Sequence, residues 1–425
     1  MDFLKDWWTY HSCYEIPRNY AFWSGLGTLG AVVNRKVFYL HGRIEFHGNL
    51  YVGLIGPQGS SKSTCCDFAC AYFREACPDA NIGPSRSSPE SLVKIMSEKD
   101  FARVFTNERG ESVEVRPFAF FINEFKNFVG RSPFDMLTWL TDVYDRKFYD
   151  ASTIVRGLEP IVNPSVNLIM CETPDWMIRN LKADVISGGF SRRIIYAYET
   201  GKVEAKPHIV LTKPDELMTT VDVQLREDAL RAEERFKRRL VEVRSVKGEY
   251  KWTADGSNIY EKWYHDNARR EASEPNKVMA GYLGSKNVQL YKVMMLLDVS
   301  SDKPMLVFNA DMVDMGLALL DAVEGNMPKL SAAAGRNELM GPQQRILELV
   351  QQGWSGGAGW IPEKELAKGI ETEVQPLERM SILRHLEDTG QLIKREFDIV
   401  NSAGVSVRRM MYLLPWKYEE LKGQK

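Results

Sequence analysis

The chain has 425 residues, of which 44% are hydrophobic and 26% charged, the balance of a folded globular protein rather than a disordered or fibrous one. At roughly 150 residues per domain, this length predicts two or three domains. The 55 basic and 57 acidic residues give a net charge of -2, which excludes a basic protein that coats nucleic acid, so any such contact must come from local patches.

The start of the chain does not read as a membrane or secretory segment. The uncharged stretch 19–34 is shorter than the roughly 20 apolar residues that span a bilayer, and glycines interrupt it. The first residues include acidic side chains and tryptophans, where a secretory signal has a basic and then an aliphatic run. We therefore expect a cytoplasmic protein without a membrane contact. The cysteines lack metal-ligand spacing and are expected to be small buried apolar residues.

The pattern along the chain predicts four parts. Residues 1–48 read as an N-terminal helical region that leads into strands, and 49–213 alternate short apolar strands with helices, as in an α/β core with a largely parallel sheet. Helical periodicity over 214–335 predicts an α-helical lid. A small, polar linker at 331–343 overlaps the start of 341–425, where three helices and a β-hairpin follow in the order of a winged-helix domain.

A glycine-rich loop follows the apolar strand 50–55 and precedes a helical run. It is similar to the phosphate-loop pattern G-x-x-x-x-G-K-[ST], in which backbone N–H groups surround phosphates, the Lys reaches the β- and γ-phosphates and the hydroxyl binds Mg²⁺. Lys62 and Ser63 supply these side chains, and Ser61 stands where the pattern has Gly. The sequence thus predicts an α/β P-loop NTPase core whose ATP site comprises Gly56, Pro57, Gln58, Gly59, Ser60, Ser61, Lys62, Ser63 and Thr64.

Asn123 and Glu124 end the apolar run 118–122, which predicts a buried strand. A nucleotide hydrolase needs groups at such a strand end that organise Mg²⁺ and activate the attacking water. We expect Glu124 to be the catalytic base and Ser63, Asn123 and Glu124 to surround the metal. Asn123 brings no charge to a position where Asp is more usual.

Two other segments are expected to act on the reacting phosphate. Thr173, with Glu172 as second choice, ends another apolar strand, where ring-forming P-loop ATPases carry a polar residue that contacts the γ-phosphate or its water. Arg192 and Arg193 follow a glycine-rich turn, and one of them is expected to reach the phosphates of a neighbouring subunit. A plain strand end and a surface ion pair are the corresponding structural alternatives.

Residues 145–157 read as a β-hairpin with basic and aromatic residues at its tip. Basic side chains contact nucleic-acid phosphates and aromatic rings stack on bases, which are the two needs of single-strand binding. An exposed polar hairpin without a ligand would have the same pattern. The expected DNA contacts are Arg146, Lys147, Tyr149 and Arg156.

Four segments resemble, in order and spacing, a family of phage and mobile-element P-loop ATPases related to primase-associated helicases, with an AAA+/RecA-like ring ATPase core. They are GPQGSSKS (56–63), FFINE (120–124), the stretch 140–174 and GGFSRRIIYAYE (188–199). The resemblance covers roughly residues 1–330, and 280–286 are similar to the family's sensor-two-like helix. It implies an ATP-dependent helicase or translocase, a hexameric homo-oligomer that moves on single-stranded or forked DNA in a bacterial host, with a possible primase or polymerase partner.

The predicted winged-helix domain could bind duplex DNA or protein. Its acidic and basic residues balance, so charge alone does not favour DNA. The third helix and the hairpin carry the candidate contacts Arg379, Arg384, His385, Lys394, Arg395, Arg408 and Arg409.

Two other functions fit the same residues. One is a P-loop ATPase switch or loader that binds a replication, transposition or defence partner without processive unwinding. The other is a nucleotide-binding scaffold with impaired hydrolysis, suggested by Ser61 and Asn123, which depart from the commoner pattern. ATP hydrolysis stimulated by DNA would favour the motor over both.

Overall fold

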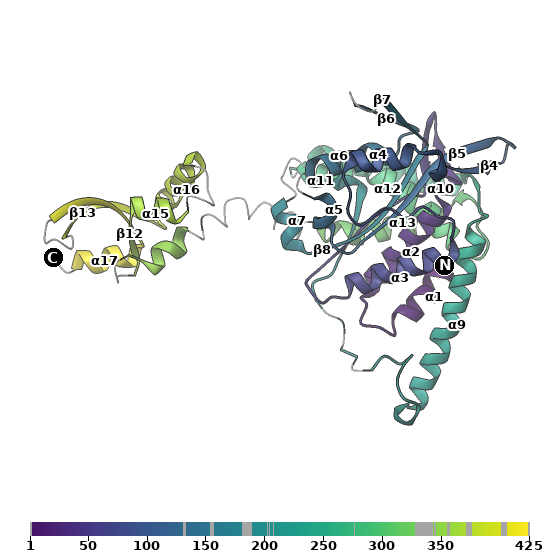
Figure 1. Cartoon of the computed structure of the whole chain (residues 1–425), viewed down its shortest axis with the longest axis horizontal. Helices are drawn as coiled ribbons and strands as arrows, with labels where there is room; N and C mark the ends of the chain where they lie inside the picture. The colour runs from purple at the N-terminus through teal and green to yellow at the C-terminus, as the bar shows by residue number, and fades with distance from the viewer. Residues whose placement is uncertain are drawn as a thin grey trace. The chain divides into compact units, whose positions relative to one another are not determined.

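The computed structural model describes residues 2–130, 133–153, 157–180, 189–201, 203, 205–206, 208–275, 277–327, 343, 346–354, 358–370, 376–400 and 406–423. The chain divides into two compact units, residues 1–331 and 332–425 (Figure 1). The division falls at the start of the predicted linker.

The first unit contains a five-stranded sheet in the order β4-β5-β8-β3-β9. Its strands are β3 (Tyr51–Ile55), β4 (Arg103–Thr106), β5 (Ser112–Ile122), β8 (Pro164–Glu172) and β9 (Ile194–Tyr198). All neighbours are parallel except β4, which pairs antiparallel with β5 at one edge. Every residue of β3 and β8 is buried, as expected for strands covered on both faces. The predicted α/β fold with a largely parallel sheet is confirmed.

Alternate strand residues face two hydrophobic cores, one on each side of the sheet. One core contains α1 (Asp2–His11), α2 (Arg18–Val33) and α3 (Lys62–Ala76), and the other contains α4 (Pro89–Ser97), α5 (Phe125–Val129) and α6 (Pro133–Val143). Helix α2 lies close to the sheet because it carries glycines there. A Cβ atom on Gly30 would lie 2.6 Å from the Gly48 carbonyl oxygen, which only glycine avoids.

The predicted N-terminal region and lid share a second sheet, in the order β11-β10-β1-β2. Parallel pairing places Val37 opposite Gly248, although the two residues are far apart in sequence. The N-terminal region and the lid are therefore parts of one unit with the core rather than separate bodies. The elements are β1 (Val37–His41), β2 (Ile44–His47), α9 (Thr220–Val243), β10 (Gly248–Trp252), α10 (Ala254–Ser273), α11 (Lys277–Leu283), α12 (Lys286–Val299), β11 (Val307–Phe308) and α13 (Ala310–Glu324).

The second unit has a three-stranded antiparallel sheet in the order β12-β14-β13, packed against helices around a core that includes Ile346, Leu386 and Tyr412. The β13–β14 hairpin follows the helices, in the order expected, while β12 and α17 were not expected. The elements are β12 (Trp360–Pro362), α15 (Glu363–Gly369), α16 (Pro376–Asp388), β13 (Ile393–Val400), β14 (Ser406–Leu413) and α17 (Pro415–Gly423).

Two expectations about the whole chain can be compared with these elements. No helix in the described part of the chain is both long and apolar enough to cross a membrane. All six cysteines are described and free, and five of them are buried, so they act as small apolar residues as expected.

Candidate functional site

The predicted phosphate loop connects β3 to α3, and its backbone is left-handed at two residues. Gly59 has φ +73° and Ser61 has φ +60°, and α3 begins at the next residue, Lys62. A left-handed backbone costs a residue with a Cβ atom about 1–2 kcal/mol. The position where the phosphate-loop pattern has glycine therefore has the backbone that favours glycine, although Ser61 occupies it.

Helix α2 fixes the start of this loop. The Tyr20 hydroxyl donates a 2.8 Å hydrogen bond to the Ile55 carbonyl oxygen at the end of β3. A Cβ atom on Gly56 would lie 2.1 Å from the Tyr20 hydroxyl oxygen and 2.9 Å from the Glu199 carbonyl oxygen. Gly56 is therefore required by close packing, in addition to any phosphate contact.

The Lys62 side chain folds back over the loop. Its Nζ donates hydrogen bonds to the carbonyl oxygens of Gly56 at 2.7 Å and Pro57 at 2.6 Å, and to Ser60 Oγ at 3.3 Å. All three acceptors are uncharged. Burial lowers the pKa of Lys62, and the nearby Cys171 and Glu172 side chains oppose this shift. Because none of these hydrogen bonds is to a carboxylate, the positive charge of Lys62 can still attract an anion.

The ends of β3, β5 and β8 bring the predicted residues to one edge of the sheet. Strand β8 lies between β3 and β5, and the Gly56 N–H donates to the Glu172 carbonyl oxygen at 3.3 Å. Asn123 and Glu124 follow β5 at the same edge, because β5 and β8 are parallel. Carboxyl ends of parallel strands are where open α/β sheets bind ligands.

Asp67 is a site residue that the sequence analysis missed. Asn123 Nδ2 donates a 2.7 Å hydrogen bond to Asp67 Oδ1, from the end of β5 to α3. Asp67 follows Ser63 by four residues, so both lie on the same face of the helix. That spacing is the signal that could have identified it.

The donor set fits a hard cation such as Mg²⁺. Ser63, Asp67 and Asn123 are all exposed and offer hydroxyl, carboxylate and amide oxygens, which Mg²⁺ prefers. Within the described ranges, no group of three or more His, Cys, Asp or Glu side chains could hold a metal ion by itself. Mg²⁺ commonly completes its coordination with substrate phosphates and water.

Glu124 and Glu172 have different environments at this edge. The Glu124 side chain is 58% exposed; it accepts a hydrogen bond from Asn127 Nδ2 and lies 3.8 Å from Lys126 Nζ. Glu172 is buried, and its carboxylate accepts hydrogen bonds from the backbone N–H groups of Lys126 and Thr173, both at 2.9 Å. The Glu172 carboxylate thus links the segment after β5 to the segment after β8 by hydrogen bonds, whereas the Glu124 carboxylate is exposed to solvent.

Thr173 lies at the carboxyl end of β8, as predicted, but its side chain contacts neighbouring residues of its own segment. Its Oγ1 accepts a 3.4 Å hydrogen bond from the Trp176 N–H in the first turn of α7 (Pro174–Asn180). Its hydroxyl also lies 3.4 Å from Glu172 Oε1. The side chain can face a ligand here, but it already helps to start a helix.

Arg192 and Arg193 lie at the amino ends of the parallel strands, whereas the phosphate loop follows the carboxyl end of β3. They precede β9, whose first residue, Ile194, pairs with Tyr51 at the start of β3. Five strand residues at about 3.3 Å each separate these amino ends from the loop by roughly 16 Å, too far for an arginine side chain. Neither residue can therefore reach the loop of its own chain.

The two arginines also differ from each other. Arg193 Nη1 donates to the Gly189 carbonyl oxygen at 2.6 Å, and its guanidinium lies 5.7 Å from the centre of the Tyr144 ring. Arg192 is exposed. Of the two arginines, Arg192 is the more exposed.

The segment that resembles a sensor-two helix also lies away from the loop. Ser285 Oγ and Gln289 Nε2 each donate to the Arg192 carbonyl oxygen at 3.2 Å, so α12 begins beside Arg192. Lys286 is fully buried and pairs with Asp321 and Glu324 of α13. Its charge is neutralised within the fold.

The predicted hairpin exists, but the described basic residues lie at its base. Strands β6 (Phe148–Thr153) and β7 (Gly157–Val162) pair antiparallel, and Arg146 and Lys147 precede β6. Arg146 pairs with Asp142 at 2.8 Å and Lys147 with Glu45 at 2.6 Å. The expectation of basic residues at the tip was therefore wrong for these two. Tyr149 packs against the second core, and Arg156 lies outside the described residues.

A cavity of about 630 Å³ adjoins the start of the phosphate loop. Asn19 of α2 donates to the Tyr198 carbonyl oxygen at 3.3 Å, and the Glu199 N–H donates to Ile55 at 2.9 Å, which places the lining beside the loop. The volume falls in the range of small-molecule sites, about 300–1,000 Å³. Sequence could not have shown this lining because it comes from distant segments: Arg18, Asn19, Phe22, Trp23, Tyr198, Glu199, Thr200, Leu319, Ala322, Val323 and Asn326.

In the second unit, the candidate nucleic-acid contacts of the hairpin are mostly paired. Lys394 pairs with Glu363 at 2.7 Å, Arg408 with Asp398 at 3.1 Å, and the Arg409 guanidinium lies 5.5 Å from the Trp354 ring. Arg395 lies 6.0 Å from the Tyr418 ring, and Arg379 donates to the Ala367 carbonyl oxygen. The exposed candidates on α16 are Arg384 and His385.

Two comparisons of this chain with known proteins found no match. No protein-family model and no curated protein matches it. A function therefore has to rest on the residues and the geometry described above.

Proposed function

We propose that the chain binds ATP with its phosphates on loop 56–64 and hydrolyses it. The observation that carries the proposal is the position of Lys62. Its ammonium lies over a loop with left-handed residues, held by uncharged acceptors, between a buried parallel strand and the start of a helix. The same sheet edge carries Asn123 and Glu124, and the adjoining cavity is large enough for a nucleoside.

In this proposal each residue has a defined task. Lys62 turns from the loop carbonyls to the β- and γ-phosphates, and the helix N-terminus behind it favours the anion. Mg²⁺ neutralises phosphate charge during transfer, and Ser63, with Asn123 and Asp67, would hold it. Glu124, which is open to solvent, accepts the proton of the attacking water.

We infer further that the chain works as a DNA helicase or translocase in a homo-oligomeric ring, with a hexamer as the expected form. Support comes from Arg192, which is exposed and too far from the loop of its own chain, so a phosphate that it contacts would belong to a neighbouring subunit. An arginine supplied by a neighbour can stabilise the charge of the transferring phosphoryl group. The β6–β7 hairpin, directly before β8, is the proposed element for strand contact, and the second unit is proposed to be a winged helix.

A switch or loader that does not unwind DNA is the alternative, and one observation favours it. Arg146 and Lys147 are paired with carboxylates at the base of the hairpin, which reduces the positive charge available to a DNA strand. Exposed ion pairs contribute little energy, so these pairs could open for a ligand. While Arg146 and Lys147 are paired with Asp142 and Glu45, they give the base of the hairpin no free positive charge that would attract DNA.

The test is to measure ATP-analogue binding and ATP hydrolysis by the full chain, with and without single-stranded DNA. Lys62→Ala should abolish binding, and Glu124→Gln should keep binding but reduce hydrolysis by 100-fold or more, on the scale of general-base loss. Asp100→Asn, which changes an exposed carboxylate on the segment before the edge strand β4, is the matched control and should change neither. Wild-type protein that does not bind nucleotide would overturn the proposal. Hydrolysis that DNA does not stimulate would favour the switch over the motor.

A further inference from the structure

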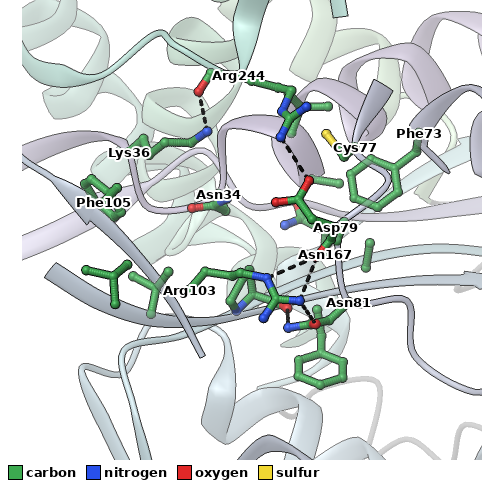
Figure 2. Close-up of a pocket in the computed structure, with 18 residues that line it drawn as sticks. Asn34, Lys36, Phe73, Cys77, Asp79, Asn81, Arg103, Phe105, Asn167 and Arg244 are labelled. Carbon is green, nitrogen blue, oxygen red and sulfur yellow. Dashed lines mark hydrogen bonds and ion pairs between the residues drawn. The ribbon is translucent and has the colours of Figure 1, made fainter. Parts of the chain in front are cut away.

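A second cavity lies at the far end of α3 from the phosphate loop, where Phe73 and Cys77 line it. Figure 2 shows the residues that line this cavity. It has a volume of about 180 Å³, and its lining combines apolar and charged side chains. The apolar part belongs to buried residues of α2, α3 and β5, among them Ala31, Val32, Phe73, Val115, Phe118 and Ala119. An apolar interior with a few converging polar groups is the usual composition of a ligand site.

Three basic side chains line this cavity, against one carboxylate. The cations are Lys36, Arg103 and Arg244, and the carboxylate is Asp79 (Figure 2). Arg244 Nη2 pairs with Asp79 Oδ1 at 2.9 Å, so one of the three charges is neutralised. The lining therefore has a net positive charge.

The other two cations contact uncharged oxygens. Lys36 Nζ donates to the Arg244 carbonyl oxygen, and Arg103 donates to the Asp79 carbonyl oxygen and, at 2.7 Å, to Asn81 Oδ1. Burial lowers the pKa of Lys36, and the positive charge of Arg244 lowers it further, while Cys77 and Asp79 oppose the shift. An anion in the cavity would favour the charged form of Lys36.

Asn167 adds a buried polar group to the lining. It is 3% exposed, and its Oδ1 accepts a 3.0 Å hydrogen bond from the Leu50 N–H. Asn167 therefore places a buried amide among the apolar side chains of the lining.

We propose that this cavity binds a small organic carboxylate whose apolar part is about the size of one six-membered ring. A cavity of about 150 Å³ holds benzene, so the volume here fits one ring and a carboxylate. Lys36, Arg103 and Arg244 supply the positive charge, and the buried apolar residues contact the ring. This site does not depend on the proposed nucleotide site.

Sodium benzoate is the probe, tested on the full chain by calorimetry and saturation-transfer NMR. A phosphate ester is unsuitable because the loop around Lys62 would also attract it. Benzoate should bind with a dissociation constant on the order of 1 mM, as expected for a ligand of this size. Benzyl alcohol, which keeps the ring without the charge, should bind at least about 10-fold more weakly.

Two variants test the location of the binding. Lys36→Met should weaken benzoate binding at least about 5-fold, and Val104→Trp should block the opening without changing the core, because Val104 lines the cavity yet is 64% exposed. Lys251→Met, an exposed lysine on β10, is the control and should bind as the wild type does. Absent benzoate binding, equal binding of the alcohol, or binding unchanged in Val104→Trp would each overturn the proposal.

Discussion

The Asn123 amide donates a 2.7 Å hydrogen bond to the Asp67 carboxylate, joining the end of β5 to the helix that follows the phosphate loop. Position 123 therefore carries an uncharged residue, and the carboxylate bonded to it comes from the helix. Because Asp67 shares a helix face with Ser63, this carboxylate lies on the side of α3 that carries the proposed metal ligand. In the proposed function, Asp67 takes the place of the aspartate that is more usual at position 123.

Exchanging the two residues tests this assignment. Asp67→Asn should reduce the Mg²⁺-dependent gain in ATP-analogue affinity about 10-fold, because a charged ligand of the cation, or of its water, is lost. Adding Asn123→Asp to that variant should restore most of the gain, since the charge returns 2.7 Å away. The measurement is the ratio of dissociation constants with Mg²⁺ and with chelator, which does not require hydrolysis.

The outcomes of this exchange are distinct. Wild-type protein without nucleotide binding would contradict the proposed function itself. If the protein binds nucleotide but Asp67→Asn leaves the ratio of dissociation constants with Mg²⁺ and with chelator unchanged, only the role of Asp67 is contradicted. Asp100→Asn again serves as the control.

A second prediction concerns the stability of the phosphate loop. Ser61→Gly should stabilise the first unit by roughly 0.5–1 kcal/mol, because relief of a left-handed serine, about 1–2 kcal/mol, exceeds the entropy that glycine adds to the unfolded chain. Denaturant unfolding followed by far-ultraviolet circular dichroism measures the difference.

Two substitutions in the same loop provide the controls for Ser61→Gly. Ser63→Gly changes a residue in the first turn of α3 and should destabilise by roughly 0.5 kcal/mol, as glycine does in helices. Gly59→Ala places a Cβ atom at φ +73° and should also destabilise. Equal effects of Ser61→Gly and Ser63→Gly would show that Ser61 is not strained.

The sequence predicted those parts of the fold that depend on local pattern. Continuous apolar runs indicated buried parallel strands, and β3 and β8 are buried throughout. The loop was predictable because glycine, lysine and serine occur at fixed spacing between a strand and a helix. Asn123 and Glu124 were expected at the same edge because they end a strand, and the parallel pairing of β5 with β8 places them there.

Long-range contacts were not predictable. The sequence gives no sign that Val37 pairs with Gly248, so the N-terminal region and the lid looked separate. The segment 280–286 resembled a sensor-two-like helix, yet Asp321 and Glu324, more than thirty residues away, neutralise its Lys286. Lys147 beside the hairpin looked available because its partner, Glu45, is distant in sequence. The partner of Arg146, Asp142, is only four residues away, so that pair could have been predicted.

A third prediction separates Arg192 from Arg193. Arg192→Ala should reduce ATP hydrolysis 10³-fold or more with nucleotide binding unchanged, on the scale of an arginine finger. Arg193→Ala should instead destabilise the fold, because Arg193 contacts Gly189 and the Tyr144 ring. Thermal unfolding and steady-state hydrolysis, measured on both variants, distinguish the two effects.

Mixing variants tests whether Arg192 acts on a neighbour. Subunits with Lys62→Ala lack a working loop, and subunits with Arg192→Ala lack the finger. A ring that mixes them contains interfaces with an intact loop and an intact Arg192, so part of the activity should return. No recovery in mixtures shown to co-assemble would contradict action between subunits.

The last prediction uses the buried His11. Its Nδ1 donates a 2.7 Å hydrogen bond to the Trp7 carbonyl oxygen, and its ring stacks on Trp7 with ring centres 4.3 Å apart. Burial lowers the pKa of His11 to about 4, below the usual value of 6.5. Below pH 6.5 the unfolded chain therefore takes up a proton that the folded protein does not. The free energy of unfolding should fall as the pH drops from about 6.5 to about 4, by up to about 1.4 kcal/mol per pH unit for this group.

His11→Phe should remove this part of the pH dependence while keeping a ring against Trp7. The buried His47, whose pKa burial lowers to about 3, contributes in the same direction, so some dependence should remain. His265→Phe, at an exposed position, is the control and should leave the slope unchanged. Denaturant unfolding at half-unit steps between pH 4 and 7.5 measures the slope. Equal slopes for His11→Phe and the wild type would mean that His11 is protonated in the folded protein, and that its burial does not exclude the charge.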